Sequence, residues 1–145
     1  MQFIKQEKVR FQHIDYAGIV FYPRFLEMLN GLVEDWFEEA LDRPFSKMHE
    51  TNGIPTVDLK VQFKNAARLG EILTKKLWVK ELKNSSIICE FEFDEFKFSL
   101  FSLTKFTNIF SNELCSVFKS FNFKPVSFKS CNKLVIPVFS VPTLY

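Results

Sequence analysis

Residues 23–40 constrain the fold more than any other part of this chain. Nine apolar side chains recur there at helical spacing: Phe25, Leu26, Met28, Leu29, Leu32, Val33, Trp36, Phe37 and Ala40. This apolar stripe is too wide for a helix that lies on a protein surface. Pro23 marks the entry, because the N–H that proline lacks would be unpaired in a first helical turn anyway. The sequence therefore predicts one long, largely buried helix.

Alternating patterns before and after this helix predict strands. Residues 3–11 form the first candidate, with three inward positions, Phe3, Val9 and Phe11. Residues 54–64 form the second, and its packed face is predicted to carry Val57, Leu59, Val61 and Phe63. Residues 71–82 and 86–94 repeat the alternation across a turn at 83–85, as in an antiparallel hairpin. One buried helix followed by consecutive strands requires an antiparallel sheet that curls around the helix.

Composition indicates a single globular domain. The 145 residues are enough to bury a core, and 47% apolar with 25% charged residues is ordinary for such a protein. Three cysteines without CxxC spacing indicate neither a disulfide framework nor a zinc site. No window approaches the roughly 18 continuous apolar residues of a membrane span, and the first residues lack a leader-like apolar run. We expect a cytoplasmic protein without a membrane partner.

The segment from residue 96 to residue 145 differs in character from the rest. It holds ten of the 19 phenylalanines and six lysines, with Glu113 as its one acidic residue. Lys97–Phe106 and Lys133–Val138 are its best strand candidates. Its lysines form no coherent basic helix or known module, so no nucleic-acid partner is expected. We assign residues 1–145 to one domain whose last third is atypical.

The stretch HIDYAGIVFYP, residues 13–23, combines features that suit acyl transfer. It sets a carboxylate, Asp15, just after a strand and about seven residues before a helix start, with the small pair Ala17-Gly18 between them. The first N–H groups of a helix lack intrahelical partners and can bind an oxyanion. A carboxylate that faces such donors across a carbonyl carbon has the geometry for acyl transfer. The alternative interpretation is that Asp15 caps a turn and that Gly18 allows it.

Three motifs resemble one family in the right order. The run from Asp15 to Pro23, the stretch Ile54-Pro55-Thr56-Val57, and the stretch from Phe63 to Glu71 (FKNAARLGE) are similar to hotdog-fold acyl-CoA thioesterases of the 4-hydroxybenzoyl-CoA thioesterase type. The resemblance covers roughly residues 8–94. The resemblance implies an α+β hotdog fold, in which a curved antiparallel sheet wraps a long central helix. It also implies a homodimer or homotetramer with active sites between subunits.

Site residues follow from this resemblance position by position. Asp15 matches the catalytic aspartate, which either attacks the thioester carbonyl or activates water, and the backbone N–H of Tyr22 matches the donor that polarises that carbonyl. Gly18 would keep the approach open. We further expect substrate contacts from His13, Phe21 and Arg68, the last toward coenzyme A phosphates. No metal or cofactor is predicted, because a thioester already has an electrophilic carbonyl and a good leaving group.

The predicted function is hydrolysis of a small aromatic or short- to medium-chain acyl-CoA to the free acid and coenzyme A. Two alternatives stay open: a thioesterase for acyl carrier protein, and a non-catalytic or inactive hotdog protein that binds acyl-CoA or itself. Asn30 departs from the resemblance, since relatives often have an acidic residue at that place in the helix.

Overall fold

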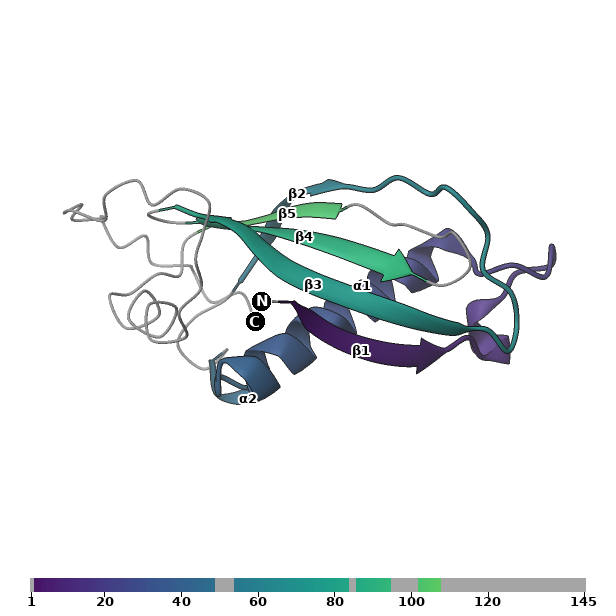
Figure 1. The fold of residues 1–145 in the computed structure, drawn as a ribbon, viewed down its shortest axis with the longest axis horizontal. Helices are drawn as coiled ribbons and strands as arrows, with labels where there is room; N and C mark the ends of the chain where they lie inside the picture. The colour runs from purple at the N-terminus through teal and green to yellow at the C-terminus, as the bar shows by residue number, and fades with distance from the viewer. Residues whose placement is uncertain (1, 49–53, 84–85, 95–101, 108–145) are drawn as a thin grey trace, which may run out of the picture.

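A five-stranded antiparallel sheet wraps around one long helix in the computed structural model (Figure 1), which describes residues 2–48, 54–83, 86–94 and 102–107. The strand order is β1-β3-β4-β5-β2. The strands are β1 (Phe3–Lys8), β2 (Thr56–Lys60), β3 (Ile72–Leu82), β4 (Ser86–Asp94) and β5 (Ser102–Thr107). The helical elements are η1 (Phe11–His13), α1 (Tyr22–Asp35), the π-helical turn η2 (Trp36–Ala40) and α2 (Phe45–Met48). The predicted α+β hotdog architecture is confirmed.

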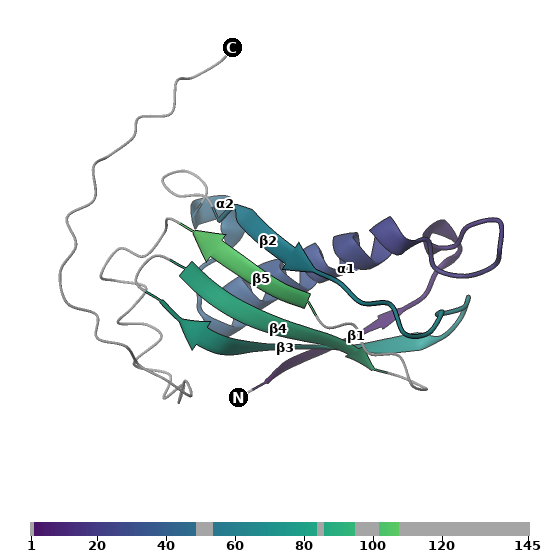
Figure 2. The same ribbon diagram turned by 90° about the horizontal axis from the view of Figure 1, so that it is seen from above.

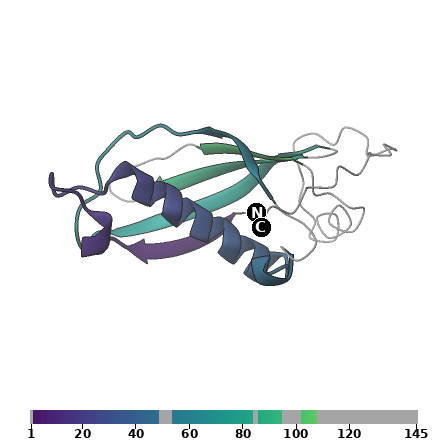
Figure 3. The ribbon, with the colours of Figure 1, turned by 180° about the vertical axis from the view of Figure 1, so that it is seen from behind.

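The helix α1 runs along one face of the sheet and continues into η2, as the view from behind shows (Figure 3). Its sheet-facing stripe is buried at Phe25, Met28, Leu29, Leu32 and Val33, and η2 adds Trp36 and Phe37. Trp36 and Phe37 have relative exposures of 1% and 0%. The prediction of one long, largely buried helix is therefore confirmed.

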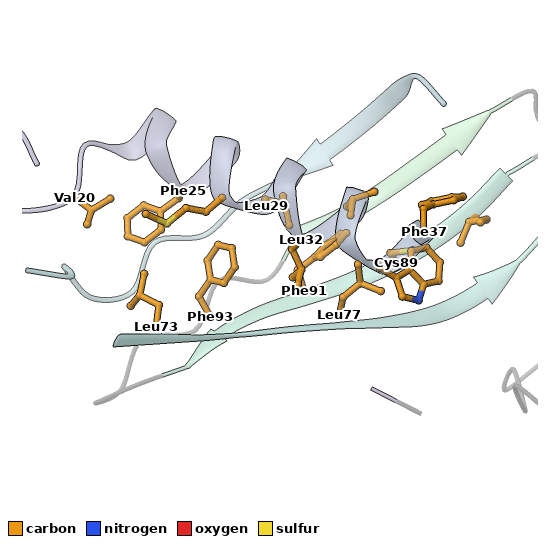
Figure 4. Packing of buried hydrophobic residues seen from close by; sticks show 14 of the residues in the cluster. Val20, Phe25, Leu29, Leu32, Phe37, Leu73, Leu77, Cys89, Phe91 and Phe93 are labelled. Carbon is orange, nitrogen blue, oxygen red and sulfur yellow. The ribbon is translucent and has the colours of Figure 1, made fainter. Parts of the chain in front are cut away.

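The opposing wall of the core comes from alternate residues of the neighbouring strands β3 and β4 (Figure 4). Leu73 and Leu77 on β3, with Cys89, Phe91 and Phe93 on β4, are all buried and belong to the same hydrophobic cluster as the helix residues. Phe93 stacks on Phe25 of α1 with ring centroids 6.1 Å apart. The pairing of β3 with β4 confirms the predicted hairpin.

Lys75 shares this inner face of β3, although it is charged. It is 5% exposed, and its ammonium pairs with the carboxylate of Glu7 on β1 at 2.5 Å. The same ammonium donates to the Met28 carbonyl of α1 at 3.4 Å. Burying a charge is unfavourable unless it is paired and hydrogen-bonded, and both conditions are met here. The pair ties β1, β3 and α1 together.

Two of the sequence predictions are wrong in detail. The first strand ends at Lys8, and the chain turns through η1, so Phe11 is 83% exposed instead of inward-facing. The second strand spans only Thr56–Lys60, and all five of its residues are exposed. It lies at the sheet edge, and a bulge at Val57 interrupts its register against β5, so the even alternation of 54–64 does not become one packed face.

The remaining elements agree in part with those predicted from the sequence. The chain between η2 and β2, for which the sequence patterns predict no element, contains the short helix α2. β5 overlaps the predicted strand Lys97–Phe106, whereas the predicted strand Lys133–Val138 lies outside the described residues. Among the described residues, no helix has both the length and the apolar character needed to cross a membrane.

A pair of phenylalanine substitutions tests this core assignment. Phe91→Ala should lower the free energy of unfolding by about 3–5 kcal/mol, because it removes a fully buried ring and leaves a cavity. Phe11→Ala, the matched control, should change it by no more than about 0.5 kcal/mol, because that ring is already in solvent. Urea unfolding at one protein concentration measures both values. Similar losses in the two variants would contradict the exposed position of Phe11.

Candidate functional site

A tight turn beyond the N-terminal end of α1 carries Asp15, and Figure 1 shows this loop projecting from the end of the molecule opposite α2. The Asp15 N–H donates to the Ile19 carbonyl at 2.9 Å, and the Gly18 N–H donates to the Asp15 carbonyl at 3.0 Å. Gly18 has φ +74°, a left-handed conformation that glycine adopts without strain. Backbone bonds around Gly18 therefore hold the turn.

The Asp15 carboxylate is exposed and has one oxygen in use. Its Oδ1 accepts a hydrogen bond from the Ala17 N–H at 2.8 Å, which is the geometry of an Asx turn. Within the described part of the chain, Oδ2 has no hydrogen-bond partner. One oxygen thus fixes the orientation of the carboxylate while the other stays available to a ligand.

The start of α1 presents a free backbone donor at the same end of the fold. Phe21, the residue before the helix, donates its N–H to the His13 carbonyl at 2.9 Å and accepts the Arg24 N–H at 2.8 Å. Pro23 has no N–H to offer. Among the described residues, the Tyr22 N–H has no acceptor. The first turn of α1 therefore leaves one donor, at Tyr22, for a ligand.

Several aromatic rings lie together at the start of α1. Phe21 and Tyr22 are 44% and 58% exposed, and their ring centroids lie 5.2 Å apart. Phe63, which follows β2, lies 6.4 Å from the Tyr22 ring and 5.7 Å from the buried Phe25 ring. The start of α1 therefore lies in an apolar environment that is partly exposed to solvent. Strand periodicity assigned Phe63 to a packed sheet face and missed this position, since the residue lies beyond the end of β2.

Arg68 and His13 occupy different surroundings. Arg68 is exposed and pairs through an isolated antiparallel bridge with Ile19, directly after the Asp15 turn. His13 is 7% exposed, and its Nδ1 accepts the Arg10 N–H at 3.0 Å. The structure thus brings Asp15, Gly18, Phe21, Tyr22 and Arg68 to one end of α1, and it buries the His13 side chain in the adjoining backbone turn.

A cavity of about 90 Å³ lies between α1 and the segment that contains β2. Its helix wall consists of Leu26, Leu29, Asn30 and Val33, and its other wall includes Thr56 and Leu59. Sequence reasoning did not identify this cavity. Helix spacing was a usable signal, since Tyr22, Leu26, Asn30 and Val33 follow one another at steps of three or four residues on one helix face. The bulge at Val57, which turns both Thr56 and Leu59 toward the cavity, left no signal in the pattern.

Nucleophilic and metal-binding groups are sparse elsewhere in the described part of the chain. Cys89 is buried, and burial raises the pKa of its thiol, which keeps it protonated and unreactive. No group of three or more histidine, cysteine, aspartate or glutamate side chains in the described ranges is arranged to hold a metal ion. The expectation that no cofactor is needed stays a prediction.

Solved structures with the same architecture include several named thioesterases. A gentisyl-coenzyme A thioesterase matches with a TM-score of 0.73 and 24% identity, over 80% of this chain and 98% of its own. A 1,4-dihydroxy-2-naphthoyl-CoA thioesterase from Synechocystis matches with a TM-score of 0.67 and 19% identity, over 74% and 81%. A 4-hydroxybenzoyl-CoA thioesterase from a Pseudomonas species gives 0.66 and 19%, over 73% and 83%. At these identities the likeness shows the fold.

Sequence comparison identifies the family. A search of curated proteins finds no significant match. The family model described as the thioesterase-like superfamily matches residues 9–110, which include the Asp15 turn, the whole of α1 and all strands from β2 to β5. Because this match covers more than half of the 145 residues, the chain belongs to the thioesterase-like superfamily.

Proposed function

We propose that this protein is an acyl-CoA thioesterase that hydrolyses a thioester to the free acid and coenzyme A. The observation that carries the proposal is the unpaired Tyr22 N–H at the start of α1, at the same end of the fold as the exposed Asp15 carboxylate. Phe21 links the two, because its N–H bonds the carbonyl of His13, two residues before Asp15. Membership of the thioesterase-like superfamily supports the same reaction.

In this proposal the Tyr22 N–H donates to the thioester carbonyl oxygen and stabilises the negative charge that develops there. Asp15 acts in one of two ways. Its free Oδ2 either attacks the carbonyl carbon to form a mixed anhydride, which water then hydrolyses, or takes a proton from the attacking water. In both routes the carbon–sulfur bond breaks and coenzyme A leaves as a thiolate that takes up a proton.

Gly18 contributes through its backbone. A Cβ built at this position meets no atom within 4 Å, so within one chain its role is the left-handed turn rather than clearance. Arg68 is the proposed contact for coenzyme A phosphates, because its side chain is exposed beside the Asp15 turn. Phe21 is the proposed apolar contact near the thioester, and His13 would contribute mainly by holding the turn.

Coenzyme A is the proposed carrier because the named structural neighbours are CoA thioesterases. The gentisyl, 1,4-dihydroxy-2-naphthoyl and 4-hydroxybenzoyl groups in their names are aromatic acyl groups. Residues 1–95 hold 13 lysine and arginine residues against 16 aspartate and glutamate residues, whereas docking of an acidic carrier protein favours a basic surface.

We also propose that the protein forms a homodimer through the edge of β2. All five residues of this strand are exposed, and Val57 is 50% exposed. Edge strands present unpaired N–H and C=O groups that favour pairing with another chain. The opposite edge, β1, has three charged residues among its six, Lys5, Glu7 and Lys8, against two among the five of β2, and charge on an edge opposes such pairing. β2 is therefore the edge better suited to a second copy.

Replacement of one carboxylate tests the catalytic assignment. Asp15→Asn should lower kcat/KM for acyl-CoA by at least about 100-fold, because the amide cannot act as nucleophile or base. Its side-chain oxygen can still accept the Ala17 N–H, so the turn should persist. Thiol release from a benzoyl-, butanoyl- and octanoyl-CoA panel measures the effect.

Asp42→Asn is the matched control. Asp42 is another exposed turn aspartate, with φ 53°, and it follows η2 at the far end of α1. Its activity should stay within about twofold of wild type, as expected for an exposed residue remote from the site. Equal activity in the two variants would rule out catalysis by Asp15. Activity on acyl carrier protein alone would select the carrier-protein alternative, and no activity on either would select a binding protein.

A charge placed on each sheet edge tests the proposed interface. Val57→Lys should convert a dimer to monomer at micromolar concentration, because it adds a positive charge to each of the paired edges. Ile4→Lys, on β1, should leave the dimer intact, although Ile4 is 51% exposed and apolar like Val57. Light scattering after size-exclusion chromatography gives the masses. A wild type that is monomeric, or a dimer lost only in Ile4→Lys, would contradict the β2 interface.

A further inference from the structure

We infer that His13 is a positioning residue, which holds Asp15 and the Tyr22 N–H in place only while its imidazole is neutral. This inference rests on the proposed thioesterase function and adds a proton-dependent control of the same site. It is carried by the hydrogen bond that His13 Nδ1 accepts, by the burial of the ring, and by the backbone bonds that join His13 to both groups.

The His13 side chain closes the short helix η1. Its Nδ1 accepts the backbone N–H of Arg10 at 3.0 Å, and the His13 N–H donates to the Arg10 carbonyl at 3.0 Å. Arg10 is the residue before η1, and His13 is the third residue of η1. The imidazole therefore has the place that a glutamate or glutamine side chain has in a capping box. These two bonds fix the conformation of η1.

The bond from Arg10 also fixes which ring nitrogen carries the proton. A backbone N–H can only donate, so Nδ1 has no hydrogen, and a neutral imidazole then has its hydrogen on Nε2. The side-chain nitrogen of Gln12 lies 3.2 Å from Nε2. Because Nε2–H is itself a donor, the amide oxygen is required there, and a half-turn of the amide exchanges the two atoms. Both ring nitrogens then have partners that suit the neutral form.

Backbone bonds connect His13 to both proposed catalytic groups. The His13 carbonyl accepts the Phe21 N–H at 2.9 Å, and Phe21 is followed by Tyr22, whose N–H is the proposed donor to the substrate. Two residues after His13, the Asp15 N–H donates to the Ile19 carbonyl at 2.9 Å. Figure 2 shows this loop, in purple, between β1 and the start of α1. His13 and Phe21 thus close the base of the loop that carries Asp15.

Protonation would remove the acceptor on which this arrangement depends. An imidazolium has hydrogens on both nitrogens, so Nδ1–H would face the Arg10 N–H and neither group could accept. The new charge would also lie on a side chain that is 7% exposed, and burial of an unpaired charge is unfavourable. The ring is therefore expected to leave this position when it takes up a proton from solvent, and the base of the loop then opens.

The charged groups nearby do not give an imidazolium a partner. Those on the loop and on the segments bonded to it are Lys8, Arg10, Asp15, Arg24, Arg68 and Glu71. In the described part of the chain, the two carboxylates among them are bonded elsewhere. Asp15 accepts the Ala17 N–H and Glu71 accepts the Arg68 N–H, both at 2.8 Å. The partners of the imidazole are instead a backbone N–H and a neutral amide.

The pH dependence of kcat/KM for the full-length protein tests the inference. Proton uptake removes the active form, so activity should fall as the pH is lowered. One pH unit below the midpoint of His13 protonation, kcat/KM should be about tenfold below its plateau. Any decline caused by Asp15 should be separable from this one, because in model peptides carboxylic acids titrate about 2.5 pH units below imidazole.

Two substitutions of His13 distinguish an acceptor from a ring that only fills space. His13→Leu should lower kcat/KM at least about tenfold at every pH, because it leaves the Arg10 N–H without its acceptor. His13→Gln should restore the plateau to within about threefold of wild type and should lack the decline at acid pH, since glutamine accepts at this capping-box position and does not take up a proton.

His49→Gln is the matched control. His49 is the other histidine of the sequence and lies outside the described residues. Its replacement should leave the decline at acid pH unchanged. A decline that persists in His13→Gln, or one that disappears in His49→Gln, would overturn the inference.

A carboxylate beside Nε2 checks the direction of the effect. Gln12→Glu places a negative charge where the amide now lies 3.2 Å from Nε2, and an opposite charge favours the imidazolium. The decline in kcat/KM should therefore move to higher pH by about 0.5–1 unit. An unchanged decline, or one that moves to lower pH, would contradict the inferred role of the neutral ring.

Nitrogen NMR of labelled histidine separates failure of this inference from failure of the enzyme assignment. Above the midpoint, His13 should show a protonated Nε2 and a bare Nδ1, and the amide signals of Phe21 and Tyr22 should change with the same midpoint as the ring. This result in a protein that hydrolyses no acyl-CoA would retain the positioning role and reject the hydrolase. A proton on Nδ1, or amide signals that do not follow the ring, would overturn the inference even in an active enzyme.

Discussion

Burial of α1 against the sheet is the interaction on which the rest of this structure depends. Helix residues such as Leu32 and Trp36 find partners because β3 and β4 present Leu77, Phe91 and Cys89 toward them. A helix buried in this way cannot end inside the core, because its terminal N–H groups would be unsatisfied. It begins instead at an end of the sheet, beside a turn. The open Tyr22 N–H is thus a consequence of how the core is built.

Periodicity in the sequence was sufficient for the elements that make the core. The helix and the β3–β4 hairpin were predicted because their apolar residues recur at 3.6 or 2 residues over long stretches. Periodicity says which residues share a face, but it does not say whether anything covers that face. Val57 and Leu59 were assigned to a packed face for this reason, although β2 is an edge strand with a bulge. Phe11 was misassigned because three residues of η1 end the alternation.

The turn at Asp15 shows why the site was only partly predictable. Reasoning from residue types left two interpretations, a turn-capping aspartate and a catalytic one. The structure has the capping bond, from the Ala17 N–H to Oδ1, and it also leaves Oδ2 open in an exposed carboxylate. These interpretations are compatible, since a fixed Oδ1 orients the free oxygen. Phe63 and Arg68 join this end through tertiary pairing, which no local pattern records.

β2 lines the cavity and, in our proposal, also forms the dimer edge, and its bulge makes both possible. In a regular strand, the side chains of Val57 and Leu59 would face the same side of the sheet. Both would then either line the cavity or face a second chain, but the strand could not do both. The extra residue at Val57 instead lets Thr56 and Leu59 both line the cavity while Val57 stays half exposed. One short strand then supplies a wall of the cavity and the proposed edge for dimerisation. Since both surfaces belong to the same five residues, dimerisation and the shape of the cavity are expected to be coupled: a partner chain paired along β2 would hold Thr56 and Leu59 in place against α1.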